Sequence, residues 1–89
     1  MIETHDRFPL AMAQEGETVR VVALTGGRSL ARRLTEIGLP VGAELELVTA
    51  AGGGQLVIAV GGTRLGLGRG MAHKIMVTPV TGTNAEERP

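Results

Sequence analysis

The segment from residue 26 to 48, GGRSLARRLTEIGLPVGAELELV, predicts a short helix followed directly by a strand. Leu30, Leu34 and Ile37 recur at i, i+4 and i+7, which places three apolar side chains on one stripe of a helix. We expect this stripe to face a core and the charged residues on the opposite side of the helix to face solvent. Ser29 is the expected N-cap.

The end of this helix is marked by residues that resist its continuation. Gly38 suits the left-handed position that follows a helix, and Leu39 would then pack back onto Leu34. Pro40 and Gly42 suit the second and fourth places of a four-residue turn, which leads the chain into the next strand.

Alternation of apolar and polar residues predicts five strands. Their ranges are 18–24, 43–49, 55–60, 63–68 and 74–78. In the second of them, Leu45 and Leu47 point inward and alternate with glutamates that point outward. Gly61 and Gly62 form a tight hairpin turn between the third and fourth strands.

The segment before the first strand, residues 8–13, is expected to form a cap of one helical turn whose Leu10 and Met12 plug one end of the core. Antiparallel strands of this number and length should close into a barrel, which also removes free edges. The fold class is therefore mainly β: a small SH3-like five-stranded barrel with one short helix inserted between strands 1 and 2.

The chain of 89 residues is long enough for one domain with a small core. We place this domain at residues 8–80, between a flexible N-terminus at 1–7 and a disordered tail at 81–89. Aromatic residues are only 1% of the chain, so the core must be built from aliphatic side chains.

Composition also argues against several classes of function. The formal net charge is zero and Phe8 is the only aromatic residue, so a nucleic-acid partner is not expected. Without cysteine the chain has no disulfide, thiolate zinc site or nucleophilic thiol, which fits a reducing compartment. The first residues do not resemble a signal peptide and no apolar run is long enough to span a bilayer. We therefore expect a cytoplasmic protein without direct membrane insertion.

No motif for chemistry is present. His5 and His73 are the only histidines, and neither lies in a metal-ligand motif. The glycines of 61–70 match neither a P-loop nor a dinucleotide-binding loop, and hairpin turns explain them better. We expect no catalytic residue, no metal ligand and no cofactor, and hence no enzyme activity.

The candidate functional residues are therefore partner-binding residues: Arg28, Arg32, Arg33, Arg69 and Met71. The first three form a basic cluster on the predicted helix, where Arg32 and Glu36 are spaced to pair at i, i+4. A solvated helix face explains this cluster better than a binding surface does, and the binding surface stays open as the functional alternative. Met71 lies in a predicted turn, where its side chain either contacts a partner or plugs the end of the barrel.

Several runs of residues together resemble the ferrous iron transport protein A family, FeoA. They are FPL at 8–10, GETV at 16–19, the segment 26–48, and GGTRLGLGRGMAHKIMV at 61–77. The most specific parts are I-G-L-x-x-G at 37–42 and R-x-x-x-G-R-G-M-A at 64–72.

This resemblance implies a bacterial SH3-like barrel that assists ferrous iron uptake. The expected partner is the FeoB membrane transporter, whose cytoplasmic portion hydrolyses GTP, so the chain would regulate it by protein–protein interaction and lie beside the inner membrane through this partner. Self-association stays open as a second kind of interaction. Two alternatives are an SH3-like domain related to those of iron-dependent transcription regulators, and a chaperone that binds Fe(II), a transition metal ion, directly.

Overall fold

The computed structural model describes residues 7–50 and 54–80. The expectations of a flexible N-terminus and a disordered tail fall, apart from Arg7, outside these ranges, as does the tip of the hairpin at 51–53. The elements in chain order are β1 (Phe8–Pro9), η1 (Leu10–Met12), β2 (Thr18–Leu24), α1 (Gly27–Glu36), β3 (Glu44–Thr49), β4 (Gln55–Val60), β5 (Thr63–Gly68), α2 (Arg69–Ala72) and β6 (Ile75–Pro79).

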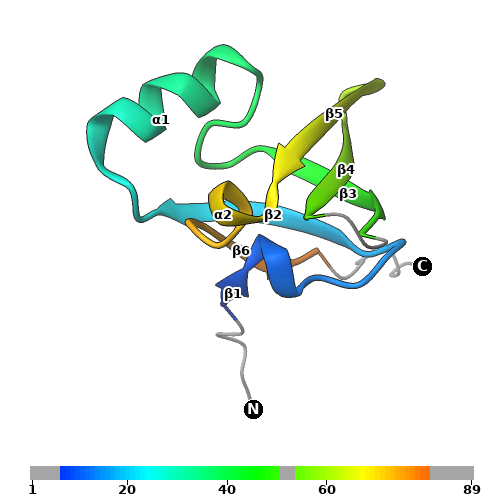
Figure 1. Ribbon diagram of the computed structural model, residues 1–89. Helices are drawn as coiled ribbons and strands as arrows, with labels where there is room; N and C mark the ends of the chain where they lie inside the picture. The colour runs from blue at the N-terminus through cyan, green and yellow to red at the C-terminus, as the bar shows by residue number, and fades with distance from the viewer. Residues whose placement is uncertain (1–6, 51–53, 81–89) are drawn as a thin grey trace, which may run out of the picture.

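The strands form one antiparallel sheet in the order β1-β6-β2-β3-β4-β5, which curls around a single apolar core (Figure 1). The predicted mainly β fold is confirmed, but the sheet has six strands instead of five and α1 follows the second of them. The additional strand is β1, in which Phe8 pairs with Val77 and Pro9 with Met76. Its pairing partner lies at the other end of the chain, so a local pattern could not reveal it.

The core is aliphatic, as expected from the composition. The fully buried large side chains are Leu10, Leu34, Leu39, Leu45, Leu47, Leu56, Ile58, Ile75, Val19, Val21 and Val77. Most of them are alternate residues of the strands, because successive side chains of a strand point to opposite faces of the sheet. Met12, predicted to plug the core beside Leu10, is instead 66% exposed. The tight 3-10 turn of η1 directs only Leu10 inward.

Two irregularities bend the sheet. The register between β2 and β6 shifts between Val21 and Ala23, and the register between β3 and β4 shifts between Leu47 and Thr49. Such bulges increase the local twist and let a sheet curl into a barrel. Among the described residues, β5 and β1 are not hydrogen-bonded to each other, so the sheet keeps two free edges. The expectation that barrel closure would remove both edges is therefore wrong. Instead η1 and α2 contact each other and fill that end of the barrel.

The C-terminus of α1 ends as predicted. Gly38 has φ +97°, the Leu39 N–H donates to the Leu34 carbonyl at 2.7 Å, and the Gly38 N–H donates to the Thr35 carbonyl at 3.1 Å. This is a Schellman motif, and both leucines at its ends are fully buried.

The start of α1 differs from the sequence-based expectation. Gly26, not Ser29, occupies the N-cap, and no side chain caps the helix. The preceding Thr25 donates its backbone N–H to the Lys74 carbonyl at 2.9 Å, so a long-range contact fixes where the helix begins.

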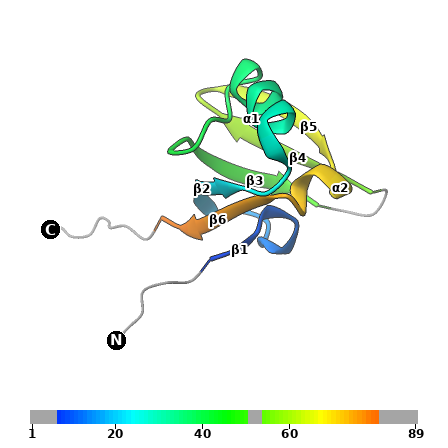
Figure 2. The same cartoon turned by 90° about the vertical axis from the view of Figure 1, so that its left-hand side faces the viewer.

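Only part of the predicted apolar stripe of α1 is covered by the core. Leu34 is fully buried and Leu30 is partly buried, but Ile37 is 39% exposed. The helix stands off the sheet, on the side opposite β1, in both Figure 1 and Figure 2, and its main contact is with β2. A helix held in this way buries one turn of its apolar face and leaves the rest accessible.

The turn after α1 lies one residue later than predicted. The Ala43 N–H donates to the Pro40 carbonyl at 3.0 Å, and Gly42, with φ +98°, occupies the third place, where a type II turn requires a positive φ. The Gly42 N–H also donates to the Val21 carbonyl at 2.8 Å. The bond to β2 fixes the register of the turn, which Pro40 and Gly42 alone do not.

Candidate protein-binding site

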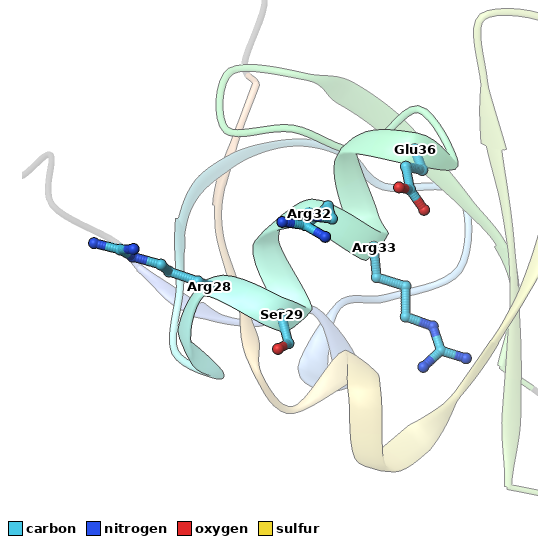
Figure 3. Close-up of a pocket in the computed structure, with 5 residues that line it drawn as sticks. All are labelled: Arg28, Ser29, Arg32, Arg33 and Glu36. Atoms are coloured by element: carbon cyan, nitrogen blue, oxygen red, sulfur yellow. The ribbon is translucent and has the colours of Figure 1, made fainter.

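Three arginines project from α1 into solvent: Arg28, Arg32 and Arg33, here called the arginine face. Together with Ser29 and Glu36 they line a shallow hollow of about 470 Å³ on the surface of the helix (Figure 3). All five lining residues come from one helix, so the hollow depends on local geometry and not on distant segments. In Figure 3 the side chains of Arg28 and Arg33 extend from the helix in different directions, which spreads positive charge along it.

None of the three charges of the arginine face is neutralised within 7–50 and 54–80. The ion pair found within the described residues joins Arg20 on β2 to Glu44 on β3, at 2.6 Å. The predicted i, i+4 pair between Arg32 and Glu36 is absent, in keeping with the weaker orientation of an arginine that precedes its carboxylate. The guanidinium groups are therefore hydrated and free to bind an acidic surface.

The other two predicted contact residues lie on α2, apart from the arginine face. Arg69 is half-buried, and its backbone N–H donates to the Gly54 carbonyl at 2.8 Å. Met71 is also half-buried and packs against the core. This position favours the alternative in which Met71 plugs the end of the barrel. The structure thus brings together three of the five candidate residues.

The described residues contain no group of three or more histidines and carboxylates close enough to hold a metal ion. His73 is exposed and follows α2 as its C-cap. His5 lies outside the described residues. The absence of catalytic, metal-binding and cofactor-binding residues stays a prediction.

Two features were not found by sequence reasoning. The Glu15 carboxylate accepts hydrogen bonds from the Ala50 N–H at 2.8 Å and from the Thr49 hydroxyl at 3.1 Å. These bonds, the backbone one first, lower the pKa of Glu15 below its ordinary value of 4.5. They connect the turn before β2 to the end of β3. Because the partners are 34 and 35 residues away, no local signal indicates them.

The second missed feature is apolar. Val41, in the turn after α1, is 59% exposed and lies four residues after the exposed Ile37. A signal for this exposure was present in V-G-A-E-L-E-L, because Val41 precedes the alternating strand and is not assigned by the alternation to its inward face.

The helices of the described residues are all too short or too polar to cross a bilayer.

Comparison with known proteins agrees with this architecture. A curated protein of Methanocaldococcus jannaschii, named as an Fe(2+) transport protein A, is 37% identical over 70 residues, which cover 79% of this chain and 84% of that protein. The crystal structure of an iron uptake regulatory protein (FeoA) has a TM-score of 0.76 and 31% identity, covering 83% of this chain and 97% of the other.

The fold also extends beyond these relatives. A manganese-dependent transcriptional repressor has a TM-score of 0.75 at 20% identity, with 88% of this chain matched to 44% of the repressor. At this identity the likeness shows the fold alone, and it confirms the predicted SH3-like architecture. The model of the FeoA domain matches residues 8–79, from β1 to the end of β6. Since that match spans most of the sequence and every described element, the chain belongs to the FeoA family.

Proposed function

We propose that this chain is a cytoplasmic accessory protein of ferrous iron uptake that binds the GTP-hydrolysing cytoplasmic portion of a FeoB-type transporter. Family membership supports the role in iron uptake, and the relative from M. jannaschii carries Fe(2+) transport in its name. The observation that carries the proposed mode of action is the arginine face of α1. It offers a charged surface for a protein partner on an element that the sheet leaves accessible.

The physical reason is the state of these charges before binding. Arg28, Arg32 and Arg33 are exposed and form no ion pair within the described chain, so a partner's carboxylates need not displace an internal one. Arginine also suits this role because its planar guanidinium binds a carboxylate through two parallel hydrogen bonds. Since the whole chain is formally neutral, a local cluster and not the overall field would direct the encounter.

The test is calorimetric titration of the protein into the purified cytoplasmic domain of the transporter. Replacing both Arg32 and Arg33 by Glu should weaken the affinity by about tenfold or more, since like charges would then face the acidic partner. The matched control changes Arg7 and Lys74 to Glu, which alters the net charge equally at two exposed positions outside α1. At Lys74 only the side chain changes, so the carbonyl that accepts from Thr25 before α1 is retained. This control should bind within about twofold of the unaltered protein.

Two results would contradict the proposal in different ways. Equal losses in the two double variants would show that net charge and not the arginine face governs binding. No binding by the unaltered protein at low or physiological salt would remove the proposed partner. Steady-state GTP hydrolysis, measured with and without the protein, then tells whether docking raises or lowers turnover.

A further inference from the structure

The two edges of the sheet differ in how they are protected. One edge is β1, which has only two residues and contains Pro9. Short length and proline are common devices against pairing with another chain. The other edge is β5, which has six residues in unbroken register with β4, from Val60–Thr63 to Gln55–Gly68. Figure 2 shows β5 at the end of the sheet opposite β1.

The register between β4 and β5 also identifies which backbone groups face the open edge of β5. The Arg69 N–H donates to the Gly54 carbonyl at 2.8 Å, which continues the β4–β5 ladder by one pair. Hydrogen-bonded pairs alternate along an antiparallel ladder. Leu67, Leu65 and Thr63 therefore direct their N–H and C=O groups toward β4, whereas Arg64 and Gly66 direct theirs away from it.

These outward groups are sterically accessible. Gly66 and the next outward position, Gly68, have no side chain, and both are exposed. The Gln55 amide lies over the face of Gly66, 3.0 Å from where a Cβ would be, whereas the space above Gly68 is open. Within the described residues no strand pairs with β5 on this side, and its ladder contains no bulge. Apart from α2, which contacts β5, and the single charge of Arg64, the edge therefore lacks the usual protection against strand addition.

The side chains beside this edge indicate what kind of strand fits it. Arg64 is exposed, it lies opposite Ala59 on β4, and it forms no ion pair in the described chain. On the other face Leu65 is only half-buried and packs against the rim of the core. A strand added here would place one set of alternate side chains beside Arg64 and the other set beside Leu65.

We propose that the free edge of β5 accepts an extended segment of a partner protein as a seventh strand, antiparallel to β5 like every other pair in the sheet, with acidic residues on the face of Arg64 and apolar residues on the face of Leu65. The backbone of Arg64 and Gly66 supplies the hydrogen bonds that hold the segment, and Arg64 supplies charge complementarity. This is β-strand addition, in which main-chain bonds give affinity and alternate side chains give selectivity. The inference does not depend on the arginine face of α1 or on the identity of the transporter.

The test uses short synthetic peptides of alternating Glu and Val, blocked at both ends. Heteronuclear NMR should show shifts concentrated on β5, and amide exchange at Arg64 and Gly66 should slow by about tenfold or more at saturation. A peptide with N-methyl groups on its Glu residues loses the edge that faces β5 and should not bind. A peptide methylated on its Val residues keeps that edge and should bind normally. Replacing Glu by Lys should weaken binding.

Two variants at Arg64 separate the contribution of its backbone N–H to peptide binding from that of its side-chain charge. Arg64→Pro removes an outward N–H, which edge strands tolerate, and should abolish peptide binding. Arg64→Gln keeps the N–H and should weaken binding of the acidic peptide while making the affinity less dependent on salt. If Arg64→Pro does not fold, the two methylated peptides still make the distinction on the unaltered protein.

Three results would overturn the inference. The first is equal binding of the two methylated peptides, and the second is saturation that leaves the Arg64 and Gly66 amides unprotected. The third is protection of these amides that rises with protein concentration without peptide, which would assign the edge to a second copy of the chain. None of these results bears on calorimetric binding of the transporter domain, so this inference and the proposed function fail separately.

Discussion

Leu39 donates its backbone N–H to the carbonyl of Leu34 at 2.7 Å, and both leucine side chains are fully buried. The bond closes the C-terminus of α1, and the two side chains anchor that helix end in the core. Because α1 has few other contacts with the sheet, this anchor determines where the arginine face is held.

Leu34→Ala should therefore destabilise the domain by about 2 to 5 kcal/mol, through lost burial and the cavity left behind. Urea unfolding followed by circular dichroism measures this change. Ile37→Ala, at the C-cap of the same helix and 39% exposed, is the matched control and should cost clearly less. Equal losses at both positions would mean that the apolar stripe is covered along its whole length.

Gly38→Ala should destabilise the domain by about 1 to 2 kcal/mol, because its φ of +97° is unfavourable for a residue with a Cβ. No neighbouring atom lies within 4 Å of the added carbon, so the cost is conformational and not steric. Gly70→Ala is the control, since it lies inside α2 with open space around it and should be neutral or stabilising by up to about 1 kcal/mol. Thermal unfolding of the two variants gives the comparison, and a neutral Gly38→Ala would argue against the Schellman geometry.

Glu15→Gln should lower the stability at neutral pH, because the charged carboxylate accepts stronger hydrogen bonds from Ala50 and Thr49 than an amide oxygen does. The folded pKa of Glu15 lies below its ordinary value of 4.5. Its stabilising effect is thus fully present above that value and is lost as the pH falls through the lower folded pKa.

Urea unfolding of the unaltered protein and of Glu15→Gln at a series of pH values from 7 downward should show a difference that shrinks with acidification. Glu46→Gln, which removes an exposed carboxylate on β3, provides the comparison and should lower the stability at neutral pH less than Glu15→Gln does. A difference between the unaltered protein and Glu15→Gln that stays constant with pH would show that the Glu15 charge has no role.

The Arg20–Glu44 ion pair should contribute little to stability. The two residues lie opposite each other on β2 and β3, with 47% and 50% of their side chains exposed. A double-mutant cycle with alanine at both positions should give a coupling energy of about 0.2 to 1 kcal/mol that declines in high salt. A larger coupling that salt does not reduce would contradict the expected solvent screening of this pair.

Local patterns in the sequence determined most of the secondary structure. The alternation of Leu45 and Leu47 with polar residues gave a strand with the correct inward face, and Gly38 gave the end of α1 with its backbone bond. These predictions succeed because a strand's two faces and a glycine's conformational freedom are properties of a few neighbouring residues.

The candidate site was predicted only in part. The three arginines of α1 are exposed, as expected for a solvated helix face, but the pairing of Arg32 with Glu36 did not follow from their i, i+4 spacing. Met71 was left between two alternatives, and its packing against the core favours the one in which it plugs the end of the barrel. Whether a side chain on a short turn is covered depends on the element that packs over it, and that element comes from elsewhere in the chain.

What the sequence by itself determined is thus most of the elements, the inward faces of the longer strands and the C-terminal end of α1. The tertiary structure decided that Phe8 and Pro9 pair with β6, that Ile37 stays exposed, and that β5 keeps a free edge. Each of these features depends on contacts between residues distant in the chain, and which contacts form depends on how the whole core packs. A local sequence pattern does not specify that packing.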